Sequence, residues 1–327
     1  MTRTINWGIL ATGGITHTFV RDLAHVKDAR LVAVGSRTQE KADEFAARHG
    51  IPRAYGTYEE LANAPEVDIV YVATPHPMHK ENVMACLQAG KAVLCEKSFV
   101  MNAQELEVLM AAAREHRLFL MEAMWTRFLP AIRKVREWLS AGVIGDVRMV
   151  DVRFGNRATW NPESRLFKPE LGGGALLDVG IYCVSFISMV LGQSPTSTQS
   201  LVNEGETGVD EVFTALLGYP DGRMASVMAG LRLKSRHEAV ILGTEGEIRV
   251  ADFWKAKSAV LTVYNQYEER FEDKGEPIGY AYEAAEAVRC MQAGQLESSV
   301  MPLDESLAIM KTMDRLRAGW GLTYPGE

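Results

Sequence analysis

Cysteine is scarce in this chain, and its spacing argues against both a zinc site and a disulfide framework. Only four cysteines occur in 327 residues: Cys86, Cys95, Cys183 and Cys290. They lack the paired spacing that either structure requires. Three of them lie in apolar runs. We therefore expect buried, reduced thiols of a cytoplasmic protein and no bound metal.

Long apolar runs and a surplus of positive charge are also lacking. No segment has the roughly 18 uninterrupted apolar residues of a membrane span. The opening "MTRTINWGIL" has no signal-peptide pattern. The formal charge is −7, from 35 Lys and Arg against 42 Asp and Glu. Because nucleic-acid binding needs a basic face, we expect no nucleic-acid partner and no membrane partner.

The chain also lacks a Gly/Ser/Pro-rich linker, an internal repeat and a low-complexity tract, although its length suits two domains. Residues 1–122 alternate strand patterns, such as "INWGIL", "ARLVAVGS" and "VDIVYVAT", with helix patterns. Gly50 is placed to end one helix and Asn102 to cap another. This alternation predicts an α/β, doubly wound parallel sheet, which is a Rossmann dinucleotide-binding domain.

Residues 123–327 have a different pattern, which predicts a second domain. Past residue 145 the strand candidates are longer and mostly without helices between them: "DVRMVDVRF", "VDEVFTALLGY", "RMASVMAGLRL", "HEAVILG" and "SAVLTVY". Turn signals stand at 219–222 and 244–246. We expect helices near 176–191, 281–293 and 303–318. The prediction is a C-terminal α/β domain with an open, largely antiparallel sheet, docked on the first across a cleft.

A glycine-containing loop follows the first predicted strand and opens a helix. It reads from Gly8 to Thr16 as "GILATGGIT". Ala11 takes the first position of the G-x-G-x-x-G fingerprint and Thr16 the third, while Gly13 falls on the second. An ordinary tight turn is an equal alternative for the loop alone. Its strand–turn–helix context favours a pyrophosphate site.

Two further loops follow strands of the same predicted sheet. Ser36-Arg37 ends the second strand, where an acid is typical of NAD sites and an arginine suits a 2′-phosphate. This favours NADP over NAD, against the alternative of a solvated arginine. The loop Thr74-Pro75-His76-Pro77-Met78-His79 follows the strand at 67–73. Its two histidines lack the further ligands that a zinc site needs.

The run "VLCEKSF" at 93–99 places Glu96 and Lys97 directly after an apolar strand pattern. Charges at the carboxyl end of such a strand lie where open α/β sheets bind their ligands. We therefore expect Lys97 at the floor of a reaction cleft, with Glu96 helping to hold the cofactor and the lysine.

These motifs together resemble the glucose-fructose oxidoreductase / inositol dehydrogenase (Gfo/Idh/MocA) family, in particular its members that oxidise D-xylose or trans-dihydrodiols. The resemblance rests on "GILATGGI", "SR", "TPHPMH" and "CEK", with "GKAVLCEK", "LFLMEAMWTRF", "GGGALLDVGIYCVSF" and "ETGVDE". It runs from about residue 5 to the C-terminus. Ser98 departs from the family motif E-K-P, in which proline follows the lysine.

The resemblance implies which residues carry the chemistry. Lys97 is the family's catalytic lysine, and Tyr182 is the acid/base that takes the hydroxyl proton. A phenol ordinarily has a pKa of about 10, and a nearby ammonium such as that of Lys97 favours the phenolate. Asp178, four residues before Tyr182 and on the same face of a helix, would orient substrate hydroxyls or Lys97. Without the other family motifs, Tyr182 would be interpreted as a half-buried core residue.

The implied binding residues form two sets. The cofactor-binding residues are expected to be Gly8, Ala11, Thr12, Gly13, Gly14, Ile15, Ser36, Arg37, Thr74, Pro75, His76, His79, Glu96, Lys97, Trp125 and Arg127. The substrate-binding residues are expected to be Lys97, Trp125, Phe154, Trp160, Arg165, Asp178, Tyr182 and Trp254. Trp160 and Arg165 fall in a long loop that is predicted to cover the substrate. An aromatic residue in a sheet is more often core than ligand.

The sequence therefore predicts an NADP-dependent dehydrogenase that acts on a CH–OH group of a small polyhydroxylated substrate. The resemblance implies an aldose such as D-xylose, or a trans-dihydrodiol, and a homodimer formed through the C-terminal sheet. The alternatives are a catalytically silent NADP-binding regulator and an inositol or amino-sugar dehydrogenase of the same family. Tyr182 weighs against the inositol alternative, because those enzymes carry histidine at that position.

Overall fold

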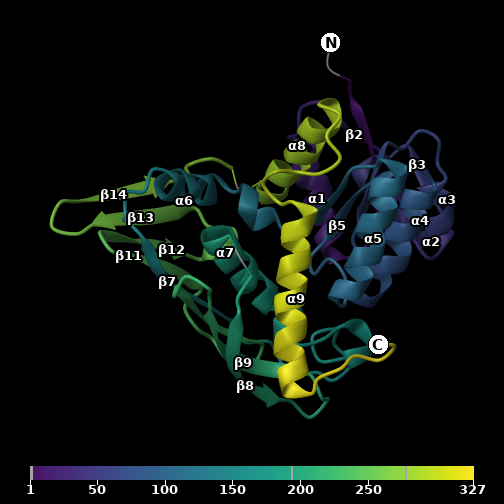
Figure 1. Cartoon of the computed structure of the whole chain (residues 1–327). Coiled ribbons are helices and arrows are strands. Elements are labelled where there is room, and N and C mark those ends of the chain that lie inside the picture. Colours follow the sequence, from purple (N-terminus) through teal and green to yellow (C-terminus); the bar gives the residue numbers. More distant parts are fainter. Residues whose placement is uncertain (1–2, 193, 277) are drawn as a thin grey trace. The chain divides into compact units, whose positions relative to one another are not determined.

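The computed structural model describes residues 3–192, 194–276 and 278–327, and the chain divides into two compact units (Figure 1). Unit 1 comprises Met1–Trp125 and Pro277–Ser306, and unit 2 comprises Thr126–Glu276 and Leu307–Glu327. The predicted division after residue 122 assigned all later residues to the second domain. Residues 277–306 instead belong with unit 1, so the first unit is built from two separate segments.

Unit 1 contains a parallel sheet of six strands in the order β3-β2-β1-β4-β5-β6. The strands are β1 (Ile5–Leu10), β2 (Ala29–Gly35), β3 (Arg53–Tyr55), β4 (Ile69–Val72), β5 (Ala92–Glu96) and β6 (Leu120–Ala123). Every residue of β4 and β5 is buried, because helices cover both faces of such a sheet. The strand order reverses next to β1, which is the topological switch point of a Rossmann fold. The predicted Rossmann unit is confirmed.

The helices of unit 1 lie close to the predicted helix patterns, although several ends differ by one or two residues and α3 was not predicted. They are α1 (Gly14–Leu23), α2 (Gln39–His49), α3 (Tyr58–Ala62), α4 (His79–Gln88), α5 (Ala103–His116) and α8 (Gly279–Gln292). Asn102 accepts the backbone N–H of Glu105 and caps α5. Gly50 ends α2 with φ of 66°, a left-handed conformation that favours glycine.

Helix α8 explains why residues 277–306 join unit 1. It packs against α1, and Figure 1 shows the two helices side by side. The backbone N–H of Tyr280 donates to Asp22 Oδ2 at 3.2 Å, and the Tyr280 ring stacks on Trp125 at 4.9 Å. These contacts join residues more than 150 positions apart, so no local pattern could reveal them.

Unit 2 contains an eight-stranded sheet in the order β14-β13-β12-β11-β7-β10-β9-β8. The strands are β7 (Val147–Gly155), β8 (Ser197–Glu204), β9 (Asp210–Gly218), β10 (Met224–Gly230), β11 (Glu238–Gly243), β12 (Gly246–Ala251), β13 (Ser258–Val263) and β14 (Tyr267–Glu272). Neighbouring strands are antiparallel except for β7 and β10. The predicted open, largely antiparallel sheet is confirmed.

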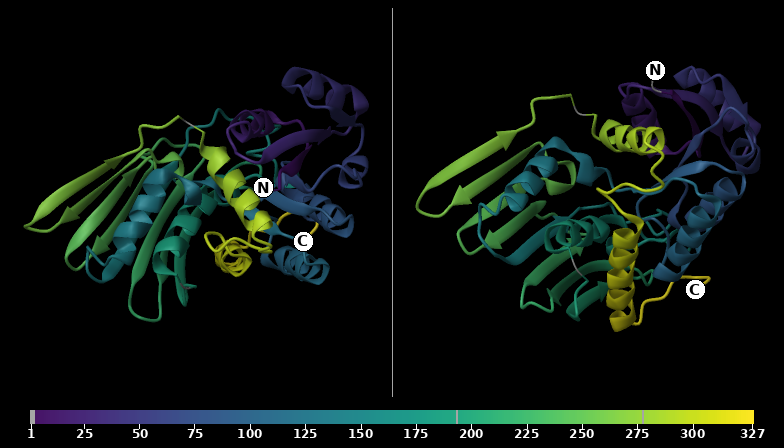
Figure 2. Two further views of the ribbon diagram at one scale, coloured as in Figure 1. Left: turned by 90° about the horizontal axis from the view of Figure 1, so that it is seen from above. Right: turned by 45° about the horizontal axis from the view of Figure 1, so that its top comes forward.

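One face of this sheet is covered by helices and the other is open. Helices α6 (Pro130–Ser140) and α7 (Ile181–Leu191) pack on the covered face, as Figure 2 shows, and α9 (Leu303–Trp320) ends beside β8 and β9. Strand β9 alternates buried Phe213, Ala215 and Leu217 with outward residues. This alternation fits a sheet that buries a single face.

Strands β8 and β14 were not predicted, and both lie at the edges of the sheet. Their sequences, "STQSLVNE" and "YEERFE", are polar and mostly exposed. Edge strands commonly carry charged and polar residues that discourage pairing with other chains. That composition removes the apolar alternation on which strand prediction depends.

The four cysteines and one long apolar helical stretch lie mostly in the interior of the structure. All four cysteines are buried and free, as predicted, and burial raises the pKa of the Cys86 thiol to about 12. The stretch Pro169–Leu191 is long and apolar enough to cross a membrane, but 78% of its apolar window is buried inside the structure. A core helix of this kind is expected in a large α/β protein.

Candidate functional site

The loop after β1 leaves an open helix N-terminus at the carboxyl edge of the parallel sheet. Gly13 is the N-cap of α1, and no side chain caps it. A Cβ built on Gly13 or Gly14 meets no described atom within 4 Å. The loop therefore offers backbone N–H groups beside open space, which is the arrangement that binds a pyrophosphate.

Ala11 has a backbone conformation that ordinarily favours glycine. Its φ is 88°, and its N–H donates to the carbonyl of Gly35 at 3.0 Å, which ties the loop to the end of β2. The fingerprint position that Ala11 occupies usually holds glycine for a tight turn. The loop thus keeps the tight turn although alanine occupies the position of the glycine. The positive φ at Ala11 costs free energy that glycine would not incur.

The end of β2 places Ser36 and Arg37 beside the same loop. Ser36 is buried, with its Oγ 3.3 Å from Thr12 Oγ1, whereas Arg37 is exposed. Burial raises the pKa of the Tyr58 phenol, and the nearby charge of Arg37 partly offsets that rise. Arg37 and Tyr58 are therefore close enough to interact electrostatically.

Tyr58 also lines a cavity of about 500 Å³ in unit 1. The cavity lies between α3 and α4 and reaches Leu10 at the end of β1. Its walls include the apolar Ala62 and Ala85 and the amide of Asn82. Glu59 and Glu81 also line this recess, so the recess itself suits an uncharged aromatic base rather than an anionic group.

His79 lies inside the loop that follows β4. Its ring has no exposed surface, and its nitrogens lie 2.7 Å from the carbonyl oxygen of Thr74 and 2.9 Å from that of Ser98. Burial lowers the pKa of this imidazole, although its backbone hydrogen bonds oppose that effect. His79 therefore joins the loop after β4 to the loop after β5, and its predicted role in cofactor binding stays a prediction. His76 is buried as well.

Glu96 and Lys97 end β5 as predicted, and each has a different environment. Glu96 is buried and accepts the hydroxyl of Tyr71. Lys97 is partly exposed, and the peptide bond that joins it to Ser98 is cis. Lys97 thus lies at the carboxyl edge of the sheet, where Rossmann folds bind their ligands.

A group of buried carboxyls surrounds Glu96 in unit 1. Ser306 donates to Glu122 Oε2 at 2.8 Å, and Glu283 of α8 is fully buried. Burial and the neighbouring charges of Glu96, Asp22 and Glu122 hold the pKa of Glu283 well above its usual range. This environment favours the neutral form of the Glu283 carboxyl. No group of His, Cys, Asp or Glu in the described ranges has the geometry of a metal site.

Tyr182, Phe154 and Trp254 form one aromatic cluster in unit 2. The Phe154 ring centroid is 5.7 Å from that of Tyr182 and 5.3 Å from that of Trp254, and the Tyr182 and Trp254 centroids are 6.1 Å apart. Phe154 lies near the end of β7, Tyr182 lies in the first turn of α7, and Trp254 follows β12. Three predicted substrate-binding residues from three separate elements are thereby brought together.

Asp178 precedes Tyr182 in a π-helical turn, Leu176–Gly180, rather than in a regular α-helix. The prediction that Asp178 and Tyr182 share one helix face assumed regular α-helical spacing. The π-helical turn changes the spacing between these two residues. The carboxylate of Asp178 accepts Arg165 Nη1 at 3.0 Å, and the arginine is more than half exposed. π-Turns occur frequently at functional sites. The predicted covering loop is thus tied to Asp178.

The glycine run before Asp178 is required for close packing. A Cβ on Gly173 would lie 2.9 Å from the carbonyl oxygen of Leu166 and the backbone nitrogen of Lys168. Gly174 has φ of 117°, and a Cβ there would collide with Asp210. Asp210, from the motif "ETGVDE", accepts the N–H of Leu176 at 2.6 Å. Burial raises the pKa of Asp210 to about 7.

Three residues that were predicted to bind the cofactor or the substrate have environments that do not test that prediction. The Arg127 guanidinium is buried and donates to Ser185, both to Oγ at 3.0 Å and to the carbonyl at 2.8 Å. Trp125 is buried against Tyr280. Trp160 is 37% exposed in the loop after β7. Ligand roles for these side chains stay predictions.

His237 is a contact of the aromatic cluster that the sequence did not reveal. Its Nδ1 accepts Trp254 Nε1–H at 3.1 Å, and its Nε2 lies 2.9 Å from the carbonyl of Gly155. The Phe154 centroid is 4.5 Å from the imidazole. The residue begins the predicted strand "HEAVILG", but nothing local in that stretch indicates a partner in β7.

A Rossmann unit with an open helix N-terminus, joined to a mixed sheet that carries an aromatic cluster, defines a dinucleotide-binding oxidoreductase. Residues 5–124 match the oxidoreductase family with an NAD-binding Rossmann fold, and residues 132–249 match the GFO/IDH/MocA C-terminal domain. The chain belongs to the Gfo/Idh/MocA oxidoreductase family. The expectation from sequence is confirmed.

Several relatives are similar over the whole chain. Trans-1,2-dihydrobenzene-1,2-diol dehydrogenase of Xenopus tropicalis is 39% identical, covering 98% of this chain and 99% of the relative. The enzyme of the same name from Homo sapiens is also 39% identical, covering 99% of each chain. These likenesses extend through both units, so they concern the complete two-unit chain.

Solved structures share the fold. The aldose-aldose oxidoreductase of Caulobacter crescentus, complexed with glycerol, has a TM-score of 0.88 at 22% identity and covers 97% of each chain. A 3-ketoreductase of Actinomadura kijaniata, in complex with NADP and TDP-benzene, has a TM-score of 0.84 at 25% identity, covering 97% of this chain and 98% of that one.

Proposed function

We propose that this protein is an NADP-dependent dehydrogenase that oxidises a carbinol carbon of a small polyhydroxylated substrate. The substrate class is an aldose of the D-xylose type or a trans-dihydrodiol. The observation that carries the proposal is the Tyr182 phenol, packed against Phe154 and Trp254 with Asp178 one turn earlier. The names of the relatives, which act on a dihydrodiol, support the same class.

The residues of unit 1 fit a dinucleotide with a 2′-phosphate. The open N-terminus at Gly13-Gly14 suits the pyrophosphate, and the recess lined by Leu10 and Tyr58 suits the adenine. Arg37 is exposed beside that recess and would pair with the 2′-phosphate. Because NAD lacks that phosphate, the proposal gives NADP the higher affinity.

The proposed chemistry divides between the two units. When bound, the nicotinamide would accept the hydride from the carbinol carbon. Tyr182 would take the hydroxyl proton, and the ammonium of Lys97 would favour the phenolate or donate to the reacting oxygen. Asp178, held by Arg165, would orient the substrate hydroxyls. The aromatic cluster would exclude water and cover the apolar face of a sugar or diol ring.

The open face of the unit 2 sheet is the proposed dimer contact. Leu201, Leu216 and Met224 are 77%, 56% and 55% exposed and lie on neighbouring strands β8, β9 and β10. Exposed apolar groups of this kind are typical of interfaces. A second copy of the chain is the proposed partner. In a two-fold symmetric dimer, each copy would bury the same sheet face against that of the other copy.

The test is NADPH formation by the purified protein with a panel of aldoses, inositols and a trans-dihydrodiol, repeated with NAD. The proposal predicts turnover of aldoses or the dihydrodiol with NADP, and much weaker turnover with NAD. Tight NADP binding without turnover of any substrate would contradict it and would favour a binding-only regulator.

A further inference from the structure

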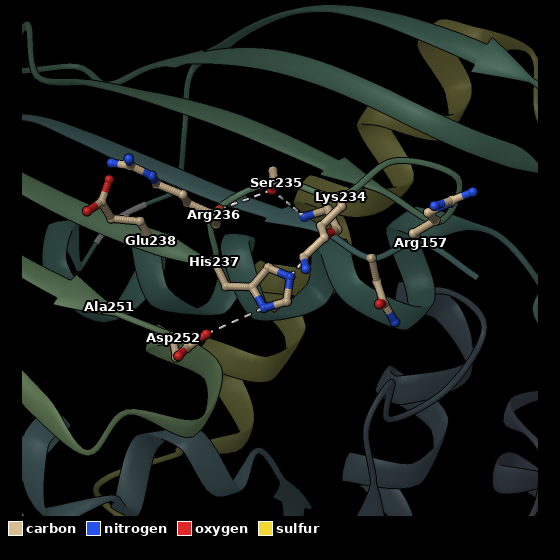
Figure 3. A pocket seen from close by; sticks show the side chains of 10 residues that line it. Arg157, Lys234, Ser235, Arg236, His237, Glu238, Ala251 and Asp252 are labelled. Carbon is tan, nitrogen blue, oxygen red and sulfur yellow. Dashed lines mark hydrogen bonds and ion pairs between the residues drawn. The ribbon is translucent and has the colours of Figure 1, made fainter. Parts of the chain in front are cut away.

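A cavity of about 630 Å³ lies in unit 2 next to the aromatic cluster (Figure 3). It is formed by the end of β7, the loop that precedes β11 and the end of β12. Its size is typical of small-molecule sites, which usually range from about 300 to 1,000 Å³. The residues named above as cofactor-binding or substrate-binding do not line it.

Three positively charged side chains line this cavity, and two of them, Arg157 and Lys234, lie at one end (Figure 3). Arg157, Lys234 and Arg236 all line it, and all are exposed. Within the described ranges, no carboxylate forms an ion pair with any of them. Nearby arginines differ: Arg232 pairs with Glu211 and Arg153 pairs with Asp151.

The acidic residues of the cavity lie apart from two of these cations. Asp252 Oδ1 is 3.7 Å from His237 Nδ1, and Glu238 follows His237 in the chain. In Figure 3 the Arg157 and Lys234 side chains lie on one side of the His237 ring, with Asp252 and Glu238 on the other. One end of the cavity therefore carries Arg157 and Lys234 apart from Asp252 and Glu238, and Arg236 lies with these two acids at the other end. This arrangement would orient an anionic ligand toward Arg157 and Lys234.

His237 connects the cavity to the aromatic cluster. Its Nε2–H donates to the carbonyl of Gly155 at 2.9 Å, which leaves Nδ1 to accept Trp254 Nε1–H at 3.1 Å. The neutral tautomer satisfies both contacts. The imidazole is thus held between the cavity and Trp254, so a ligand that spans the ring would contact both regions.

The walls of the cavity are held in place by backbone contacts. The N–H of Ala158 donates to the carbonyl of Leu231 at 2.7 Å, and the Ser235 hydroxyl accepts the N–H of Gly155 at 2.8 Å. A bridge joins Arg157 to Arg232. Because the loops that carry the cations are fixed in this way, less conformational entropy is lost when a ligand binds.

We propose that this cavity binds the anionic group, a phosphate monoester or a carboxylate, of a polyhydroxylated substrate whose reacting carbon is oxidised at Tyr182. The proposal rests on the proposed function and adds the substrate's charge to it. Guanidinium groups bind phosphate and carboxylate through paired hydrogen bonds, and a lysine adds a point charge. Arg157 and Lys234 are assigned this contact.

The test compares charged and neutral substrates of the same ring. The ratio of kcat/KM for D-glucose 6-phosphate or D-glucuronate to that for D-glucose is measured for the wild type, the double variant Arg157→Ala/Lys234→Ala and the control Lys257→Ala. Lys257 is exposed in the same unit and does not line the cavity. We expect a wild-type ratio of about ten or more, retained in the control and lost in the double variant.

A wild-type ratio at or below one, or a ratio that the double variant leaves unchanged, would overturn the inference. A gain with the phosphate alone or with the glucuronate alone identifies which anionic group is bound. Calorimetric titration of D-glucose 6-phosphate provides a readout that does not need turnover. About tenfold weaker binding by the double variant than by the control supports the cavity even if the proposed dehydrogenase reaction fails. Equal binding by all three proteins refutes it.

Discussion

The carboxylate of Asp210 accepts the backbone N–H of Leu176 at 2.6 Å, at the start of the turn that leads to Asp178 and Tyr182. Gly174 must lack a side chain for this approach, because a Cβ there would collide with the same carboxylate. Two motifs that are far apart in the sequence, "GGGALLD" and "VDE", thus form one structural contact. The position of the candidate catalytic tyrosine depends on it.

Asp210 should make stability fall as pH rises. Burial raises its pKa from 3.8 to about 7, so the folded state holds a proton that the unfolded state releases between these values. The free energy of unfolding therefore decreases as pH rises through that window and levels off above it. Between pH 5 and 8, we expect the free energy of unfolding of the wild type, measured by urea denaturation, to fall by a few kcal/mol at most. The decrease should be smaller in Asp210→Asn. Asp146→Asn, at an exposed site, is the control. Parallel pH profiles for wild type and Asp210→Asn would refute this assignment.

Ala11→Gly should stabilise the protein. The alanine has φ of 88°, where a Cβ costs roughly 1 kcal/mol that glycine does not incur. We expect a higher unfolding midpoint, equivalent to about 1 kcal/mol, measured by urea denaturation. Ala24→Gly is the matched control, since Ala24 has φ of −61° and glycine there should destabilise. A loss of stability in Ala11→Gly would contradict the account of this loop.

Arg37→Ala should reduce the preference for NADP over NAD. A charge-assisted contact with the 2′-phosphate is worth roughly 1.5–3 kcal/mol, so we expect NADP to bind about ten to a hundredfold more weakly and NAD to be little affected. Dissociation constants from fluorescence titration provide the measurement. Arg30→Ala, within strand β2 itself, should change neither constant. Equal weakening of both dinucleotides would remove the assigned role of Arg37.

Leu216→Arg should favour the monomer. Leu216 is 56% exposed on the open sheet face, and a charge at the centre of an apolar interface is left unpaired. Sedimentation velocity at several protein concentrations is the measurement, with Leu296→Arg in unit 1 as the control, because that residue is also exposed but lies elsewhere. A wild type that sediments as a monomer at every concentration would contradict the proposed dimer.

Much of the fold could be predicted because the signals are local. The buried strands β4 and β5, the cap at Asn102 and the left-handed Gly50 follow from patterns of a few residues. The family resemblance supplied Tyr182, Phe154 and Trp254, which the structure brings together in one aromatic cluster.

The remainder depends on contacts between distant residues. Helix α8 joins unit 1 through Tyr280 and Asp22, which are 258 positions apart. His237 reaches Gly155 across 82 positions, and no pattern near either residue indicates the pair. The π-turn at Leu176–Gly180 depends on Asp210 from another element. Sequence periodicity reports which face of an element is apolar, not which partner covers it.

The most direct test of the central claim is turnover by Tyr182→Phe and Lys97→Ala, with Tyr264→Phe as the control at an exposed tyrosine. NADPH formation is followed with the best substrate of the wild type, and NADP binding is titrated for each protein. The account predicts at least about a hundredfold loss of kcat in both variants, near-normal NADP binding and an unaffected control. Unchanged turnover in Tyr182→Phe and Lys97→Ala would contradict the claim that these two residues carry the reaction.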